Sequence, residues 1–221
     1  MTKSPITHAI FDLDGTLLDT ESLYSEAARI VCSRHGGAYS LEIKRAVMGG
    51  DTLSGALHTI EALGLPIEPS RYIEEREREL HLLLDRVVPM AGAVALVEGL
   101  RARNIPIAVA TSGHRAITER KLQDQPFLHE LSALVCGDDP RLQRPKPFPD
   151  IYLLAAGELA ADPRTCLVIE DSLNGLRAGL AAGMRTVALV DRRWGFEPSL
   201  FAAAEQVVHD LTELKLTNFG L

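Results

Sequence analysis

The chain has 221 residues, of which 46% are hydrophobic and 24% are charged, and its formal net charge is −7. This composition is typical of a globular protein with one main core, and the acidic balance argues against nucleic acid and anionic membranes as partners. The three cysteines (Cys32, Cys136 and Cys166) are widely spaced, which argues against a disulfide framework or a zinc site and favours a reducing compartment. We find no apolar leader and no stretch long enough to span a bilayer, and therefore expect a cytoplasmic protein.

The first predicted strand is Ile6–Leu13, an apolar run that leads into Asp12, Asp14 and Gly15. Two aspartates at this spacing would point to opposite faces of a continuing strand. Gly15 allows the backbone to turn away, so both carboxylates can gather at the carboxyl end of the strand. There, one carboxylate can act as a nucleophile and the other can exchange protons, although an ordinary polar turn would have the same composition.

Residues 20–88 are predicted to be helical because apolar residues recur there at three- and four-residue spacing, as at Leu53, Ala56, Leu57 and Ile60. The mixed-charge run 74–79 is interpreted as the solvated face of a helix with local ion pairs. This segment is expected to form a small inserted all-helical cap domain.

Helices and strands alternate from Pro89 onward, which predicts an α/β fold with a Rossmann-like parallel sheet core and helices on both faces. Pro149 is placed in the first turn of a helix and Gly183 at a helix C-terminus. The core is expected to comprise residues 1–19 and 89–221, with the cap at 20–88. The predicted helices are Ala93–Arg103, Ala116–Leu122, Asp150–Leu159 and Leu173–Ala182, and the predicted strands are Pro106–Ala110, Leu131–Cys136, Cys166–Ile169 and Thr186–Val190.

Ligands of open parallel sheets bind at the carboxyl ends of the strands, so residues that follow the predicted strands are candidates for a site. A helix start after the second strand offers backbone N–H groups to a phosphate. The carboxylates of Asp12, Asp14, Glu170 and Asp171 could not all be ionised together without a cation. Oxygen ligands with no His or Cys nearby in the sequence favour Mg²⁺ as that cation. The candidates are Asp12 and Asp14, Thr111 and Ser112, Lys146, and Glu170 and Asp171.

These four ordered segments resemble the motifs of the haloacid dehalogenase superfamily of phosphotransferases, over essentially the whole chain. The resemblance implies that Asp12 attacks phosphorus and forms an aspartyl-phosphate. It implies that Asp14 protonates the leaving oxygen and then activates water for hydrolysis. Thr111 and Lys146 would hold the phosphoryl oxygens, and Ser112 is a further candidate for phosphate binding.

The same resemblance implies a Mg²⁺ site. Its ligands would be Asp12, the backbone carbonyl of Asp14, and Asp171, with Glu170 in the outer shell.

The helical insert resembles the cap of the beta-phosphoglucomutase-like branch of the superfamily. The segments 137–140, 146–150 and 170–175 are similar to those of the pseudouridine-5′-phosphatase and glycerol-3-phosphatase group. This similarity implies Mg²⁺-dependent hydrolysis of a small phosphomonoester of a sugar, polyol or nucleoside. The expected partner is a small phosphorylated metabolite, with no nucleic acid or membrane, and the expected state is a monomer or weak dimer.

A phosphosugar mutase is the main alternative because that branch has the same core motifs. It places a histidine where this chain has Tyr24, and an arginine after a glycine in the cap loop, where this chain has Gly49, Gly50, Asp51 and Thr52. These departures favour hydrolysis over internal transfer.

Three further alternatives are less favoured. A dehalogenase would not need Asp14 because halide leaves without a proton. A phosphonate-cleaving relative would use a cap lysine, and nothing in the sequence distinguishes Lys44. A binding protein on an inactive scaffold would usually have lost the nucleophile or the metal ligands.

Substrate contacts outside the core motifs are expected in two places. The cap loop Gly49, Gly50 and Asp51 lies where this cap type lowers a loop over the substrate, although a simple turn between helices would read the same. His114 and Arg115 follow the second strand at the mouth of the site, where they could contact substrate or be solvated.

Overall fold

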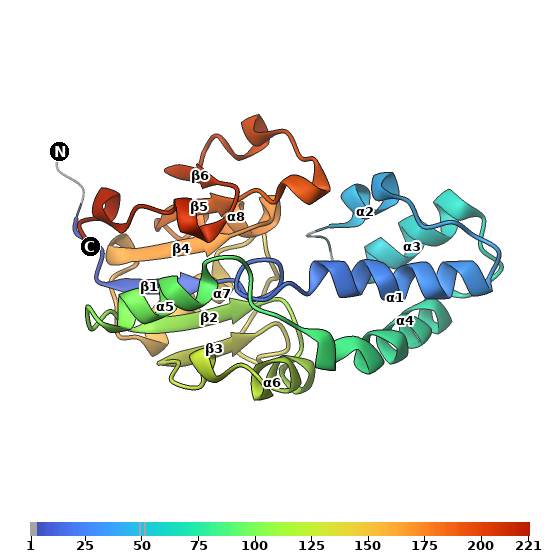
Figure 1. Cartoon of the computed structure of the whole chain (residues 1–221), viewed down its shortest axis with the longest axis horizontal. Helices are drawn as coiled ribbons and strands as arrows, with labels where there is room; N and C mark the ends of the chain where they lie inside the picture. Colours follow the sequence, from blue (N-terminus) through green and yellow to red (C-terminus); the bar gives the residue numbers. More distant parts are fainter. Residues whose placement is uncertain (1–3, 49, 51) are drawn as a thin grey trace. The chain divides into compact units, whose positions relative to one another are not determined.

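The computed structural model describes residues 4–48, 50 and 52–221 (Figure 1). The chain divides into two compact units: Met1–Leu18 with Pro89–Leu221, here named the core unit, and Asp19–Val88, the helical unit. Within the described residues, no helix has both the length and the hydropathy needed to cross a bilayer.

The core unit is built on a parallel sheet that has six strands in the described part of the chain, in the order β3-β2-β1-β4-β5-β6. β1, β2 and β4 are almost entirely buried, as expected for parallel strands covered on both faces. The predicted parallel sheet is therefore confirmed. The strands are β1 (His8–Phe11), β2 (Ile107–Thr111), β3 (Ala133–Cys136), β4 (Cys166–Glu170), β5 (Arg185–Leu189) and β6 (Gln206–Val208).

Helices cover both faces of this sheet, as predicted. Figure 1 draws α5 and α6 in front of the sheet and α7 and α8 behind it. The core between the sheet and the rear helices includes Ile10, Val168, Tyr152 and Ala178, all fully buried. The helices are α5 (Ala93–Arg101), α6 (Arg115–Gln123), α7 (Asp150–Glu158) and α8 (Leu173–Ala181).

Several boundaries differ from the predictions. β1 is shorter than the predicted strand because the chain leaves the sheet after Asp12 and turns at Gly15, where φ is +79°. β6 was not predicted, since its three residues are too short for a periodic pattern. Pro149 lies one residue before α7 and not within its first turn. Gly183 follows α8 with φ of +74°, in agreement with the predicted helix end.

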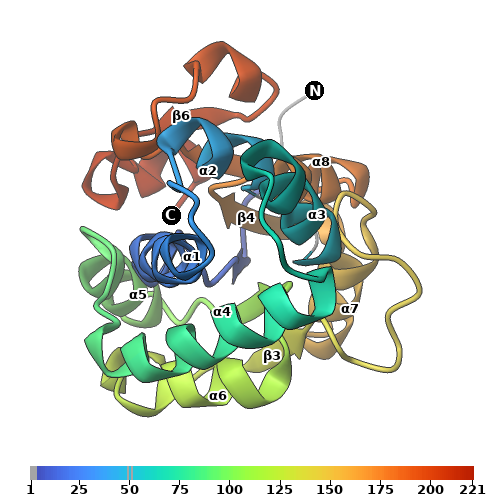
Figure 2. The same ribbon diagram turned by 90° about the vertical axis from the view of Figure 1, so that its right-hand side faces the viewer.

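The helical unit contains α1 (Glu21–Arg34), α2 (Leu41–Val47), α3 (Thr52–Leu63) and α4 (Pro69–Leu83), so the all-helical insertion is confirmed. Figure 2 looks along α1. α1 packs against α4, and α3 packs against both α2 and α4. Their shared core is apolar and includes Val31, Cys32, Ala56, Leu65 and Tyr72.

The mixed-charge run in α4 is only partly a solvated face, which corrects the prediction. Glu75 and Glu79 each have a side chain only 11% exposed and turn toward the C-terminal end of α1, where Glu79 pairs with Arg34 and Glu75 pairs with His35, the residue after the helix. Glu74 is exposed and pairs with arginines of its own helix. Partners on a neighbouring helix, invisible to local spacing, explain the buried glutamates.

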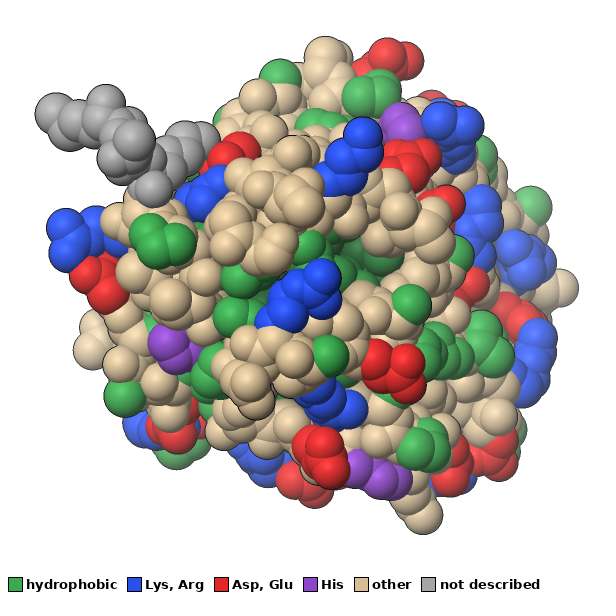
Figure 3. Space-filling model, turned by 60° about the vertical axis from the view of Figure 1, so that its left-hand side comes forward, with side chains coloured by type: hydrophobic (Ala, Val, Ile, Leu, Met, Phe, Trp, Pro, Cys, Tyr) green, Lys and Arg blue, Asp and Glu red, His purple; other side chains and the backbone are tan. Residues whose placement is uncertain are grey.

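Acidic and basic side chains are interspersed over the face of the molecule drawn in Figure 3. Many described arginines have an acidic partner, as in the exposed pair of Arg164 and Asp162.

The three cysteines, all in the described part of the chain, are buried and free, consistent with packing roles.

Candidate active site

The turn after β1 brings two aspartates to the carboxyl edge of the sheet. The backbone N–H of Asp12 donates to the carbonyl of Ile169 at 3.0 Å, so Asp12 continues the pairing with β4 by one residue. Gly15 then turns the chain, and its N–H donates to Leu18 at 2.8 Å. The Asp12 side chain is 9% exposed and that of Asp14 is 16% exposed.

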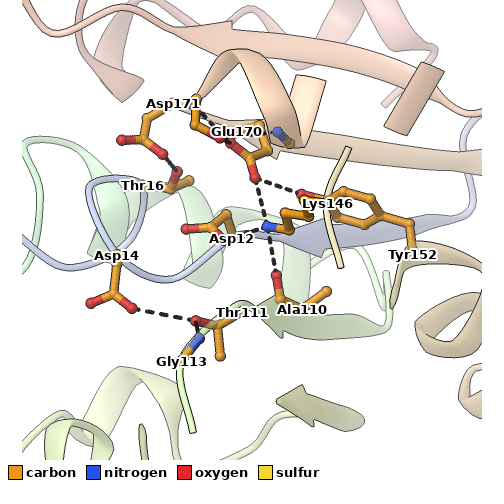
Figure 4. Close-up of polar contacts among 12 residues, drawn as sticks. Asp12, Asp14, Thr16, Ala110, Thr111, Gly113, Lys146, Tyr152, Glu170 and Asp171 are labelled. Atoms are coloured by element: carbon orange, nitrogen blue, oxygen red, sulfur yellow. Dashed lines mark hydrogen bonds and ion pairs between the residues drawn. The ribbon is translucent and has the colours of Figure 1, made fainter. Parts of the chain in front are cut away.

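Lys146 reaches this edge from the loop between β3 and α7 (Figure 4). Its Nζ lies 2.6 Å from Asp12 Oδ1 and 2.6 Å from Glu170 Oε1, and it donates to the carbonyl of Ala110 at 3.1 Å. Burial opposes the charged ammonium, but the carboxylates of Asp12 and Glu170 outweigh it and hold the pKa of Lys146 well above its ordinary value. Lys146 therefore brings a fixed positive charge to the nucleophile candidate.

Glu170, the last residue of β4, accepts hydrogen bonds on both carboxylate oxygens. Oε1 accepts from Lys146 and, at 3.0 Å, from the hydroxyl of Tyr152. Oε2 accepts from the backbone N–H and hydroxyl of Ser172, at 2.8 and 2.9 Å. A Cβ on Gly175 would lie 1.6 Å from Oε1, so this glycine leaves the space that the carboxylate fills. These contacts favour a role in which Glu170 holds Lys146 in position, rather than one in which it binds a metal ion directly.

Thr111 ends β2 beside Asp14. Its Oγ1 donates to Asp14 Oδ2 at 3.3 Å and accepts from the N–H of Gly113 at 3.0 Å. Only 1% of Thr111 is exposed. Its hydroxyl is thus held at the start of the segment that leads into α6.

The buried residues of the site that were not predicted include Lys121 and Tyr152. Lys121 on α6 is fully buried, and its Nζ lies 2.5 Å from Asp14 Oδ1. Lys121 lies three residues after the buried Thr118, so helical periodicity could have indicated that it faces inward. Tyr152 on α7 is fully buried against Glu170, and Lys146 Nζ lies 5.0 Å from the centre of its ring. A tyrosine among apolar residues gave no sequence signal.

Asp171 follows Glu170 and accepts a hydrogen bond from the hydroxyl of Thr16 at 3.4 Å. Asp12 and Asp171 follow the paired strands β1 and β4, so both carboxylates lie at the point where the strand order reverses. Among the described residues, no three His, Cys, Asp or Glu side chains are grouped closely enough to hold a metal. The predicted ligands are the carboxylates of Asp12 and Asp171 and the backbone carbonyl of Asp14. Such a set still fits Mg²⁺, which is often bound by one or two carboxylates and keeps several waters.

The electrostatic environment of Asp12 is also suited to a cation. Burial raises the pKa of Asp12 to about 7; Lys146 opposes the shift, while Glu170 and Asp14 add to it. A divalent cation would relieve the repulsion between these carboxylates.

The remaining predicted residues are more peripheral. Ser112 is exposed and lies with Lys146 on the wall of a cavity of about 340 Å³, which the 142–145 segment also lines. His114 is exposed immediately before α6. Arg115 is held by hydrogen bonds within the core unit. Its guanidinium donates to the carbonyl of Leu134 at 3.2 Å, and its backbone N–H donates to Asp138.

The predicted cap-loop residues belong to the helical unit. Gly50 donates its N–H to Val47 at 3.2 Å. Gly49 and Asp51 lie outside the described residues.

Comparison with known proteins identifies the family. A family model described as haloacid dehalogenase-like hydrolase matches residues 6–183. The chain is 37% identical to "Probable pseudouridine-5'-phosphatase" of Drosophila melanogaster, over 98% of this chain and 94% of that protein. It is 34% identical to (DL)-glycerol-3-phosphatase 2 of Arabidopsis thaliana, over 99% and 93%. The crystal structure of CbbY from Rhodobacter sphaeroides in complex with phosphate superposes with a TM-score of 0.80 at 25% identity, covering 98% of this chain and 100% of that one.

The chain has a Rossmann-like core with an inserted helical unit, and its site combines carboxylates and a lysine at the edge of the sheet. These features together define a class of hydrolytic enzymes. The chain belongs to the haloacid dehalogenase-like hydrolases. Membership in this family implies a divalent metal ion as cofactor.

Proposed function

We propose that this phosphatase of the haloacid dehalogenase family hydrolyses a small phosphomonoester with Mg²⁺, through an aspartyl-phosphate on Asp12. The observation that carries the proposal is the contact of Asp12 with Lys146, at 2.6 Å, beside the Asp14 carboxylate held by Thr111. A nucleophile, a cation and a proton-exchanging group thus converge at one edge of the sheet.

In the first half-reaction, a carboxylate oxygen of Asp12 forms a bond to phosphorus while the bond from phosphorus to the ester oxygen breaks. Asp14 gives its proton to that oxygen, so an alcohol leaves and Asp14 becomes a carboxylate. Lys146 and Thr111 bind the phosphoryl oxygens and offset their negative charge, which is the main contribution a protein makes to phosphoryl transfer.

In the second half-reaction, the Asp14 carboxylate removes a proton from water while the water oxygen forms a bond to phosphorus. The bond from phosphorus to Asp12 breaks, inorganic phosphate leaves, and Asp12 is restored as a carboxylate. Asp14 is again protonated, so both half-reactions close on the starting enzyme.

Mg²⁺ would be held by Asp12, the backbone carbonyl of Asp14, and Asp171, with Glu170 in the outer shell. When bound, it would supply positive charge between the phosphoryl group and the carboxylates. The bracing contacts of Glu170 with Lys146, Tyr152 and Ser172 support its outer position.

The helical unit is proposed to act as the cap that selects the alcohol part of the substrate. The relatives named for pseudouridine-5′-phosphate and glycerol-3-phosphate support small sugar, nucleoside or polyol phosphates as the substrate class. The candidates for substrate contacts remain Gly49, Gly50 and Asp51 in this unit, and His114 and Arg115 in the core unit.

The test is phosphate release from a panel of sugar, polyol and nucleoside monophosphates with Mg²⁺. Asp12→Asn is expected to lower kcat by more than about 10³-fold because the covalent route is removed. Asp162→Asn is the matched control, since Asp162 pairs with Arg164 at the surface, and it should keep the wild-type rate.

The panel's ranking would identify the substrate class. If folded wild-type protein released no phosphate but converted one sugar phosphate isomer into another, the chain would be a phosphosugar mutase. Equal rates for wild type and Asp12→Asn would reject the aspartyl-phosphate route.

A further inference from the structure

Lys121 is a buried cation on α6 that the reaction described above does not use. Its side chain is fully inaccessible to solvent. Taking an ammonium out of water is costly unless it is paired and hydrogen-bonded. One partner is Asp14, whose Oδ1 lies 2.5 Å from Lys121 Nζ. The position of this lysine is therefore tied to the carboxylate that exchanges protons.

The Asp14 carboxylate is held on both oxygens, by groups from two different elements. Oδ1 is in contact with Lys121 of α6, and Oδ2 accepts from Thr111 of β2 at 3.3 Å. Asp14 itself lies in a turn, next to a glycine with positive φ. A side chain in such a turn has rotamer freedom that these two contacts remove.

The two buried lysines of the site serve different carboxylates. Lys146 contacts Asp12 and Glu170, whereas Lys121 contacts Asp14. A change at Lys121 is thus expected to affect proton exchange by Asp14 more than attack by Asp12.

We propose that Lys121 is a positioning residue that fixes the Asp14 carboxyl group for proton transfer to the leaving oxygen; this rests on the phosphatase function proposed above. In the step it supports, the bond from phosphorus to the ester oxygen breaks and the Asp14 proton moves to that oxygen. Positioning a general acid contributes most when the leaving oxygen is strongly basic.

The test compares two substrates that differ in their need for this proton. The alkyl substrate is the best phosphomonoester of the panel, and the aryl substrate is p-nitrophenyl phosphate, whose phenolate leaves without protonation. The parameter is kcat/KM because it reports the steps up to departure of the leaving group. Lys121→Met, which keeps length but removes the charge, should lower kcat/KM about 10²-fold for the alkyl substrate and only a few-fold for the aryl one.

A double-mutant cycle tests whether Lys121 acts through Asp14. In the Asp14→Asn background, Lys121→Met should change the residual alkyl kcat/KM little, since the group it positions is gone. Arg120→Met is the matched control: it removes a cation from the preceding residue of α6, where the side chain is 34% exposed and pairs with Asp124. This control should leave the ratio between the two substrates unchanged.

Lys121→Gln provides a second variant that retains a hydrogen-bond donor, and it should recover part of the alkyl activity. Circular dichroism and the Mg²⁺-induced rise in Tm verify that each variant is folded and binds metal. Equal losses for both substrates, or additive effects in the cycle, would overturn the proposal while leaving the phosphatase function intact. Failure of both Lys121 variants to fold would assign it a structural role instead. Absence of phosphate release by wild type would reject the proposed function and, with it, this inference.

Discussion

Glu170 illustrates how single residues set the geometry of this site. Its two oxygens accept hydrogen bonds from Lys146, Tyr152 and Ser172, and only 1% of the residue is exposed. Gly175 leaves room for the carboxylate, since a Cβ there would lie 1.8 Å from Glu170 Cδ. The carboxylate cannot shift away without breaking these hydrogen bonds, and a buried carboxylate is costly to leave unsatisfied.

Gly175→Ala is therefore expected to lower the free energy of unfolding by about 2 kcal/mol or more, through overpacking and lost hydrogen bonds. Activity should fall as well, because Lys146 loses its fixed position. Gly157→Ala is the control on α7, where a Cβ meets no atom within 4 Å. It should be neutral or stabilising by up to about 1 kcal/mol. Urea unfolding curves that matched for the two variants would contradict this explanation.

At the scale of elements, the start of α8 connects helix stability to the site. Ser172 is the N-cap of α8, and its Oγ accepts from the N–H of Gly175 at 3.0 Å. The same hydroxyl donates to Glu170 Oε2 at 2.9 Å. One side chain thus caps a helix and braces the carboxylate that holds Lys146.

Ser172→Ala should lower the free energy of unfolding by about 1 kcal/mol and also lower kcat/KM, because both the cap and the brace are removed. Ser40→Ala removes the N-cap of α2, where the hydroxyl accepts from Ile43 at 3.3 Å. It should lose comparable stability at unchanged kcat/KM. An unchanged kcat/KM in Ser172→Ala as well would show that the brace is dispensable. Denaturant titrations and steady-state kinetics provide both readouts.

At the scale of the whole molecule, the carboxylates at the sheet edge connect folding to protons and metal. The pKa of Asp12 is raised by burial from 3.8 to about 7. Between these values the folded protein binds a proton that the unfolded chain has released. The stability contributed by this group without metal is therefore present at low pH and lost as the pH rises through that window.

Mg²⁺ competes with this proton, so its stabilising effect should grow as the pH rises. We expect a Tm increase of about 5 °C or more at about pH 8, with free Mg²⁺ near a hundred times its dissociation constant, and a smaller increase at about pH 5. Thermal unfolding with Mg²⁺ and with chelator measures the difference. Asp12→Asn should abolish the pH dependence of the Mg²⁺ effect. Equal shifts at both pH values would contradict the coupling of Asp12 to the metal.

Periodicity and strand-end motifs predicted much of the architecture. Alternation after Pro89 predicted the parallel sheet, and helical spacing predicted the insertion, because both patterns are local consequences of burying one face. The same patterns do not predict β6, which is only three residues long, and they place Glu75 and Glu79 of α4 on a solvated face, whereas both side chains are buried. Asp12 directly follows β1 and Lys146 comes from the loop after β3, and the two side chains lie together because parallel strands share one carboxyl edge.

The sequence by itself determined the fold class and the chemical identity of the carboxylates, threonine and lysine that follow the strands. Those features depend on the spacing of residues along the chain, which is visible in the sequence itself. Only the tertiary structure decided that Lys121 contacts Asp14 and that Tyr152 braces Glu170. These contacts join residues separated by 107 and 18 positions, and they follow from how helices pack on the sheet. The direction in which a buried polar side chain points is set by that packing, since its partner must compensate for lost water.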